Sequence, residues 1–425
     1  MIELEYPKNW GCTRLKNVAL VNENSLSTST QSDYILNYLE ISNVTNHGII
    51  SKDEIRELFF SDAPSRARRI VRNGDTVISS VRPNLQAIAY IKHTSGNLIA
   101  STGFYVVTPI KKHLDEKYTY YLLVSDGSRQ HLESVAKGVG YPAVDDKDFV
   151  TLKFAIPSLL EQQHIVAYLD TTCSVIDKAI EAKQKQLEIL DDLRKSIIHK
   201  AVTRGLDDSV ELKDSGVEWL GRIPKHWNCE HLKRVCSRIQ TGSTPPTANT
   251  EYYVDGTIPW YAPGCYDGDI YLQEPAKKIN EIAYFHNKLR LYPAHSIFIV
   301  GIGATIGKVA MTRVEASCNQ QITALVCNSD VYAKYLTYHL KIFESIIPRI
   351  AQFTTLPIMD QNKIGYLQIA LPPIKEQEQI AEFLDDKIAK NDRLENNLVK
   401  QISTLEQYRK SLIHECVTGK RRSAG

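Results

Sequence analysis

One stretch of about fifty residues occurs twice in this chain, and no other feature limits its architecture as strongly. Residues 156–205 and 371–420 align without a gap at an offset of 215 residues, and about a third of the positions are identical. A shorter match, PKNW from Pro7 and PKHW from Pro224, precedes each copy by a domain-sized interval. A period of half the chain is too long for a solenoid. The sequence therefore predicts the order domain, helical segment, domain, helical segment.

Both copies of the repeat have the pattern of a long amphipathic helix. Ser158 followed by Glu161 predicts a capping box, and Pro373 replaces the hydroxyl cap in the second copy while still favouring a helix start. Gly205 is typical of the position after a helix end. Residues that recur every seven positions form one stripe that must be buried. The rows of this stripe are Leu169, Ile176, Lys183, Leu190 and Ile197 with Cys173, Ile180 and Leu187 in the first copy, and Leu384, Asn391, Leu398, Leu405 and Leu412 with Ile388, Glu395 and Ile402 in the second.

Each predicted helix has one obvious partner, which is the other helix. We expect the two to pack as an antiparallel coiled coil about 65 Å long, at ~1.5 Å per residue, and to hold the flanking domains apart. The polar members Lys183 and Asn391 weaken the stripe locally and can fix its register. The alternative is that each stripe packs on its own domain.

The two globular domains share a skeleton and differ in their loops. The segments DTVISSVRPNLQAIAYI from Asp75 and HSIFIVGIGATIGKVAMT from His295 both predict strand, loop, strand. The predicted fold class is α+β, with two mixed α/β domains separated by two long helices in a pseudo-two-fold internal repeat. The predicted boundaries are 1–155 and 206–370 for the domains, and 156–205 and 371–425 for the helical regions.

Composition adds limits on where this protein works and what it binds. Apolar residues make up 43% and charged residues 24% of the chain, as in ordinary soluble proteins. The formal net charge is only +2, so a nucleic-acid surface must be a local patch or groove. No signal peptide, no membrane span and no CxxC pair among the eight cysteines is evident. We therefore expect a cytoplasmic protein with reduced thiols and without a metal site.

Candidate nucleic-acid contacts lie in the predicted loops of both domains. Arginine can bind guanine or phosphate with two hydrogen bonds, and asparagine or glutamine can bind adenine. In the first domain the candidates are Arg66, Arg68, Arg69, Arg82 and Asn84. In the second domain they are Gln240, Thr241, Ser243, Thr244, Lys308 and Gln320. The alternatives are a solvated charged surface for the arginines, buried amides that satisfy backbone groups for Gln320 and Gln321, and core packing for Trp260, Tyr261 and Tyr266.

Motifs for catalysis are missing from the sequence. There is no (D/N)PP(Y/F) loop of an adenine methyltransferase and no phosphate-binding Walker A loop. The segment GIGATIG from Gly301 has the spacing GxGxxxG, which favours a tight hairpin or a close backbone approach over a dinucleotide site. His199 and His414 recur in the repeat beside an Arg-Lys-Ser run, where they indicate capping or interface residues.

The motifs together resemble the DNA-specificity subunit of type I restriction-modification systems. The resemblance rests on the duplicated P-x-x-EQ-x-x-I…LD segments, IPKHW, TGSTPP, TIPWY, GATIGKVA and SCNQQ, and on SRARRIV, GDTVISSVRPN and ASTGF in the first domain. It covers the chain from about Pro7 to about Thr418. Pro373 at the helix start and Lys183 and Glu395 on apolar rows depart from the expected pattern, which affects the local helix register.

The resemblance implies a function and a set of partners. Each domain would be a target-recognition domain for one half of a bipartite asymmetric site in double-stranded DNA. The paired helices would set the half-site spacing and dock two modification (methyltransferase) subunits. S-adenosylmethionine would be bound by those subunits, and ATP and Mg by restriction (translocase/nuclease) subunits, so that this chain is non-catalytic and binds no cofactor. The rival interpretations are an enzyme with its own active site and a coiled-coil scaffold that does not bind DNA.

Overall fold

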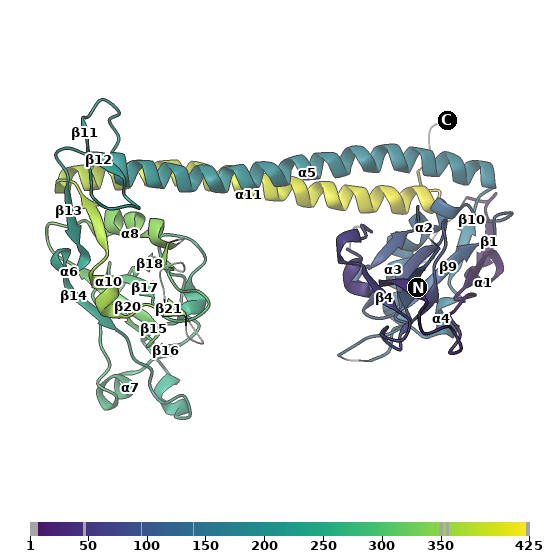
Figure 1. Ribbon diagram of the computed structural model, residues 1–425, viewed down its shortest axis with the longest axis horizontal. Coiled ribbons are helices and arrows are strands. Elements are labelled where there is room, and N and C mark those ends of the chain that lie inside the picture. The colour runs from purple at the N-terminus through teal and green to yellow at the C-terminus, as the bar shows by residue number, and fades with distance from the viewer. Residues whose placement is uncertain are drawn as a thin grey trace. The chain divides into compact units, whose positions relative to one another are not determined.

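The computed structural model describes residues 7–45, 48–94, 96–138, 140–344, 346–347, 352–353 and 357–421. The chain forms two compact units (Figure 1): unit 1 is Met1–Gln184 with Val399–Gly425, and unit 2 is Lys185–Leu398. Two long helices, α5 (Leu159–Arg204) and α11 (Ile374–Val417), each contribute to both units. The domain boundaries expected from the sequence are not tested by this division and stay a prediction.

Unit 1 contains two four-stranded sheets and a two-stranded one. The strand order is β2-β9-β6-β7 in the antiparallel sheet and β4-β3-β8-β5 in the mixed sheet, where β3 and β8 run parallel, while β1 pairs with β10. The elements are β1 (Gly11–Arg14), α1 (Leu15–Val18), β2 (Ala19–Val21), β3 (Ile35–Leu39), β4 (Arg56–Phe59), β5 (Ala67–Ile70), β6 (Thr76–Ser79), β7 (Ile88–Tyr90), β8 (Leu98–Ser101), β9 (Phe104–Pro109), α2 (Glu116–Val124), α3 (Asp126–Val135), α4 (Asp146–Phe149) and β10 (Lys153–Ile156).

Within the described residues, unit 2 has the same kinds of sheet and adds two small ones, β11-β12 and β21-β22. Its antiparallel sheet has the order β14-β20-β17-β18, its mixed sheet β16-β15-β19, and β13 pairs with β23. The elements are β11 (Leu212–Asp214), β12 (Arg222–Pro224), β13 (Asn228–His231), α6 (Leu232–Val235), β14 (Cys236–Thr241), β15 (Ile258–Tyr261), β16 (Lys278–Ile279), α7 (Glu281–His286), β17 (Ile297–Val300), β18 (Val309–Met311), β19 (Ser317–Cys318), β20 (Ile322–Cys327), α8 (Ala333–Lys341), β21 (Gln352–Phe353), β22 (Pro357–Ile358), α10 (Gln361–Gly365) and β23 (Gln368–Leu371).

The two units have matching antiparallel sheets, and their mixed sheets share a parallel pair of strands. The order β2-β9-β6-β7 corresponds to β14-β20-β17-β18, and the parallel pair β3–β8 corresponds to the parallel pair β15–β19. The predicted strand, loop, strand segments are β6–β7 and β17–β18. The predicted fold class, mixed α/β domains with an internal repeat and paired long helices, is confirmed.

A buried glutamine in the repeat attaches each domain to its long helix. The Gln162 side-chain nitrogen Nε2 donates to the carbonyl oxygens of Pro157 and His113, both at 3.0 Å, and its Oε1 accepts from the Asp115 N–H at 2.8 Å. Its side chain is fully buried. Because a buried amide without partners is costly, these three bonds fix the start of α5 against the loop before α2.

The second copy makes the same three bonds in unit 2. Gln377 Nε2 donates to the carbonyls of Pro372 at 2.9 Å and Asp330 at 3.2 Å, and Oε1 accepts from the Tyr332 N–H at 2.8 Å. The glutamine of the repeated Glu-Gln pair therefore attaches the start of α11 to the segment that begins α8.

The other acidic residues of the repeat complete this attachment. Asp170 accepts from Lys117 and from the Tyr121 hydroxyl, both at 2.6 Å. Its counterpart Asp385 in unit 2 accepts from Lys334 at 2.7 Å and from the Tyr338 hydroxyl at 2.8 Å. Both pairs of donors come from the short helix that follows the sheet, α2 or α8.

The predicted capping box is half correct. The Glu161 N–H donates to the Ser158 hydroxyl at 3.3 Å, as a capping residue requires. The Glu161 carboxylate does not return to the Ser158 N–H, since it accepts from the Trp10 indole at 3.2 Å. Glu376 likewise accepts from the Trp227 indole at 3.0 Å. The PKxW motif is thereby joined to the helix start in each unit.

The long helices pair antiparallel within each unit (Figure 1). In unit 1, Asp177 of α5 pairs with Arg409 of α11 at 2.8 Å, and Lys183 donates to Gln401. In unit 2, Arg194 of α5 pairs with Asp392 of α11 at 2.7 Å. Partner numbers fall along α11 as they rise along α5, which confirms the antiparallel prediction.

The polar residues on the predicted stripe are paired or exposed. Asn391 is buried and donates to the Leu190 carbonyl of α5 at 3.3 Å, so it favours a single register. Glu395 is exposed, and its place on the apolar row was wrong. The buried members lie in the first halves of α5 and α11 and near the end of α11, where they belong to the hydrophobic clusters of their own unit. Buried members are Leu169, Cys173, Ile176, Ile180, Leu384, Ile388 and Leu412.

Removing one docking glutamine tests this account of the repeat. In Gln162→Ala the Asp115 N–H and two carbonyls lose their buried partner, and we expect local opening of α2 to become easier by about 3 kcal/mol. Hydrogen–deuterium exchange of α2 measures this directly. The neighbouring Gln163 is exposed, so Gln163→Ala is the matched control and should change protection by less than ~0.5 kcal/mol. Equal protection in the two variants would contradict the docking role.

Candidate nucleic-acid interface

Four segments meet beside the antiparallel sheet of unit 2. We call them loop cluster 2, which consists of residues 241–244, 301–308, 319–321 and 358–361. The Gly301 N–H donates to the Gln321 carbonyl at 2.7 Å, and the Met359 N–H donates to the Gly301 carbonyl at 2.8 Å. The Ser243 N–H donates to the Cys318 carbonyl at 2.9 Å. Backbone bonds between segments thus hold the loops together.

Unit 1 builds the equivalent loop cluster 1 from residues 79–87, 101–103 and 141–144. The Ser80 N–H donates to the Gly103 carbonyl at 2.8 Å, and the Val144 N–H donates to the Ser80 carbonyl at 2.9 Å. These are the same two backbone bonds, at equivalent positions, as in loop cluster 2. One scaffold therefore presents two clusters that carry different side chains.

Strand β5 contains Arg68 and Arg69 of the arginine run in the first domain, and Arg66 lies just before it. Arg66 precedes the strand and is exposed, and across the described ranges its guanidinium makes no hydrogen bond or ion pair. Arg68 lies over the Phe60 ring at 4.8 Å. Arg69 Nη1 donates to the Ser25 hydroxyl at 3.5 Å. Of these three predicted contacts, Arg69 is the one with a donor used inside the fold, whereas the side chains of Arg66 and Arg68 make no hydrogen bond or ion pair within the described residues.

Arg82 lies in loop cluster 1, apart from that run. Its guanidinium carbon is 4.0 Å from the centroid of the Tyr141 ring. Tyr141 is 71% exposed and is not among the residues predicted from the sequence. The Gly-Tyr-Pro sequence in a predicted loop is the signal that could have identified Tyr141 as a candidate residue. The backbone of Asn84 belongs to the short turn after Arg82, and its side chain lies outside what the structure describes.

Five of the six predicted residues of the second domain lie in loop cluster 2, and Gln240 lies next to it in β14. Gln320 is exposed, and its amide oxygen accepts from the Thr244 hydroxyl. The hydroxyls of Thr241 and Thr323 are 3.2 Å apart. Lys308 is half-buried, and within the described residues its ammonium has no ion-pair partner. Ser243 is half-buried beside them. The structure brings these segments together but does not itself test their contact with DNA.

Some of the polar groups in loop cluster 2 serve the fold. Gln321 Nε2 donates to the Ile302 carbonyl at 3.4 Å, which is the structural role that the sequence left open for this amide. The Gln240 carbonyl accepts from the Tyr292 hydroxyl at 3.2 Å, and burial raises the pKa of Tyr292 to about 12. Burial also raises the pKa of the Cys318 thiol, so that the thiol stays protonated.

Glycines permit the close approach of the segments. A Cβ on Gly301 would lie 2.7 Å from the Met359 carbonyl oxygen, and Gly303 has a φ of +104°. A Cβ on Gly242 would lie 2.2 Å from the Cys318 carbonyl oxygen. The GIGATIG segment is therefore a hairpin that is fitted against neighbouring backbone, as predicted. Trp260, Tyr261 and Tyr266 are buried, which confirms their prediction as core residues.

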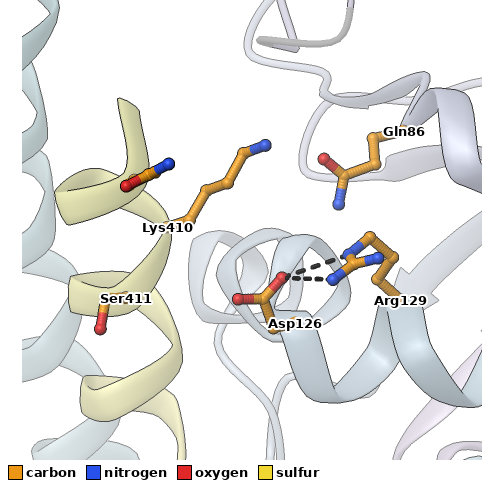
Figure 2. A pocket seen from close by; sticks show the side chains of 6 residues that line it. Gln86, Asp126, Arg129, Lys410 and Ser411 are labelled. Carbon is orange, nitrogen blue, oxygen red and sulfur yellow. Dashed lines mark hydrogen bonds and ion pairs between the residues drawn. The ribbon is translucent and has the colours of Figure 1, made fainter. Parts of the chain in front are cut away.

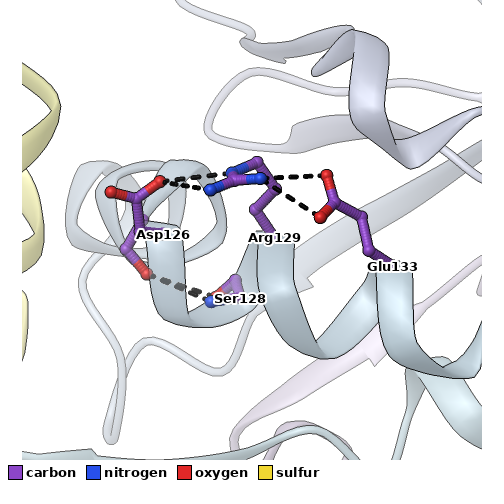
Figure 3. A network of polar contacts seen from close by, with 5 residues as sticks. Asp126, Ser128, Arg129 and Glu133 are labelled. Atoms are coloured by element: carbon purple, nitrogen blue, oxygen red, sulfur yellow. Dashed lines mark hydrogen bonds and ion pairs between the residues drawn. The ribbon is translucent and has the colours of Figure 1, made fainter. Parts of the chain in front are cut away.

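A polar recess of about 460 Å³ lies between α3 and the C-terminal part of α11 in unit 1 (Figure 2). It is lined by Gln86, Asp126, Arg129, Gln407, Lys410 and Ser411. Figure 3 shows that the Arg129 guanidinium is held on two sides: Nε and Nη2 donate to Asp126 at 3.2 and 3.1 Å, and Nη1 donates to Glu133 at 3.0 Å. The two carboxylates neutralise this arginine, which leaves it poorly suited to bind a phosphate.

The two recurring histidines belong to different units. His199 is near the end of α5 in unit 2, and His414 is near the end of α11 in unit 1. Burial lowers the pKa of both imidazoles. Among the residues that the structure describes, no group of three His, Cys, Asp or Glu side chains is arranged to hold a metal ion. No helix in the same described ranges is long and apolar enough to cross a membrane.

A duplicated scaffold that presents two unlike loop clusters defines a recognition protein with two binding regions. A family model described as the type I restriction modification DNA specificity domain matches residues 7–197 and, a second time, residues 224–404. The chain belongs to this family.

Curated relatives and solved structures agree over nearly the whole chain. A putative type I restriction enzyme MjaX specificity subunit of Methanocaldococcus jannaschii is 22% identical over 424 residues, which cover 98% of this chain and 94% of the relative. A structure from work on complex assembly and conformational transition of the type I R-M system has a TM-score of 0.79 at 20% identity, covering 98% and 100% of the two chains. The HsdS subunit from Thermoanaerobacter tengcongensis has a TM-score of 0.55 at 20% identity, covering 99% of each chain.

Gly242→Ala tests the close approach in loop cluster 2. The added Cβ meets backbone that cannot move without breaking the bond from Ser243 to Cys318, and we expect the free energy of unfolding of unit 2 to fall by about 2 kcal/mol or more. Thermal denaturation checks this. Gly264→Ala is the control, because Gly264 is exposed with no atom within 4 Å of a Cβ there. A wild-type melting temperature for Gly242→Ala would show that the segments are loosely held.

Proposed function

We propose that this chain is the DNA sequence-recognition subunit of a type I restriction-modification complex. Each target-recognition domain reads one half of a bipartite, asymmetric site in double-stranded DNA. The paired helices set the spacing between the half-sites and dock the modification subunits. The proposal is supported by family membership and by the relatives, which are specificity subunits.

The observation that carries the proposal is the pair of loop clusters. The same two backbone hydrogen bonds hold each cluster on an equivalent sheet, yet loop cluster 1 offers an arginine and loop cluster 2 offers amides, hydroxyls and a lysine. A scaffold protein that does not bind DNA would not need two loop clusters with the same backbone and different polar side chains. An asymmetric DNA site does, because each half-site needs its own donors and acceptors.

We assign the chemistry to the partner subunits. The modification subunits bind S-adenosylmethionine and transfer the methyl group, and restriction subunits bind ATP and Mg and cleave DNA. This chain is then non-catalytic and needs no cofactor. The net charge of +2 supports a shared DNA clamp, since a chain so near neutrality gains little from the phosphate backbone by itself.

Replacing one domain tests whether the half-sites are read independently. When residues 1–155 are exchanged for the matching domain of a relative, we expect one half-site to change and the other to stay, because each loop cluster is held inside its own unit. Methylome mapping of a host that carries the chimaera and the modification subunits gives both half-sites at once. The reciprocal exchange of residues 206–370 is the control and should change the other half. A change in both halves from one exchange would refute modular recognition.

Lengthening both helices tests their role in half-site spacing. Seven residues inserted between Gln184 and Lys185, with seven between Leu398 and Val399, keep the seven-residue stripe in phase. At ~1.5 Å per residue, the helices grow by about 10 Å, and we expect a spacer longer by about three base pairs. The same insertion in α5 alone should abolish methylation, since the pairs Asp177–Arg409 and Arg194–Asp392 then cannot both keep their register. An unchanged spacer in the double insertion would show that the helices do not set it.

A further inference from the structure

The backbone of loop cluster 1 is strained at Arg82. This residue has φ 48° and ψ 59°, and Gln86, four residues on, has φ 52° and ψ 39°. Both are left-handed conformations that a residue with a side chain rarely adopts. Pro83 follows directly and starts a short turn, so the strained residues enclose the connection between β6 and β7. Strain of this kind persists only where surrounding contacts impose it, and it often marks a functional position.

A second loop imposes the strain and supplies a partner for the arginine. Lys137 and Ala143 exchange backbone hydrogen bonds of 2.8 and 2.9 Å, and Ala143 lies two residues after Tyr141. The Arg82 N–H donates to the Pro142 carbonyl at 2.6 Å. Tyr141 is thereby held beside Arg82, with the guanidinium carbon 4.0 Å from its ring centroid.

The stacked arrangement leaves the arginine's donors available. Across the described part of the chain, the Arg82 side chain has no carboxylate partner and makes no hydrogen bond, in contrast to Arg129 of the same unit. A ring that covers one face of a guanidinium restricts its orientation but leaves the N–H groups at its edge free. An arginine that presents the N–H edge of its guanidinium in a fixed orientation can donate two hydrogen bonds to the O6 and N7 acceptors of guanine in the major groove.

We propose that Tyr141 is a positioning residue that holds Arg82 for bidentate recognition of one guanine in the first half-site. The inference rests on the proposed function and adds to it a specificity-determining residue and the base that it serves. Arg82 contacts the DNA, whereas Tyr141 acts through Arg82 by fixing the plane of its guanidinium. The phenol hydroxyl takes no part, so a phenyl ring suffices at position 141.

The test uses the full chain assembled with its modification subunits and a DNA library randomised over the first half-site. In Arg82→Lys the charge stays and the fork of donors is lost, and we expect discrimination at a single G·C pair to fall by about 10- to 100-fold. Tyr141→Leu should lower discrimination at the same pair by about 2- to 5-fold, while Tyr141→Phe should keep it. The second half-site stays unchanged in every variant and reports that the complex is folded.

Four outcomes separate the possibilities. If Arg82→Lys and Arg82→Ala leave base preference intact, and Arg82→Ala weakens binding to all sequences with a shallower salt dependence, Arg82 contacts phosphate and the proposal is overturned. If Tyr141→Phe behaves like Tyr141→Leu, the ring does not position the arginine. If the wild-type complex methylates no bipartite site, the proposed function fails and the inference fails with it. A wild-type bipartite site with unaltered variants overturns the inference alone.

Discussion

A buried side-chain amide at the start of each long helix is the contact on which the rest of the structure depends. Gln162 and Gln377 each have three hydrogen bonds inside a site without water access, and these bonds join a domain to its helix. A buried amide tolerates little displacement, because any lost bond leaves a polar group unsatisfied. The sheets and their loop clusters are therefore fixed to the helices through one residue type used twice.

The long helices are matched to each other by reciprocal charges. Asp177 with Arg409 in unit 1 and Arg194 with Asp392 in unit 2 are equivalent pairs in which the two helices exchange roles. Exposed ion pairs contribute little stability, and these are partly exposed. Their value lies in register, to which the buried Asn391 also contributes, since a shifted helix would separate charges and bury an unpaired amide.

The loop clusters separate what is constant from what varies. Ser80, Gly103 and Val144 make the backbone bonds in unit 1 that Gly301, Gln321 and Met359 make in unit 2. Backbone bonds do not depend on side-chain identity, so the tips can change their donors and acceptors without loss of the frame. The Arg82–Tyr141 stack in one unit and the Thr244–Gln320 contact in the other are two such tips. This division suits a protein whose partners stay the same while its DNA target differs.

The sequence by itself determined the duplication, the two long helices and their pairing, because seven-residue periodicity and a gapless repeat are local signals that need no tertiary information. It also selected residues that do lie in the loop clusters, Arg82 and Gln320 among them. Only the tertiary structure decided which contacts each of these side chains makes. The Glu161 carboxylate accepts from the Trp10 indole and does not complete a capping box, because that indole lies within hydrogen-bond reach only in the folded chain. The run from Arg66 to Arg69 has no common surroundings, since Arg66 precedes β5, Arg68 lies over the Phe60 ring and Arg69 donates to Ser25. Tyr141 met Arg82 across sixty residues of chain, and no spacing or composition rule encodes such a contact.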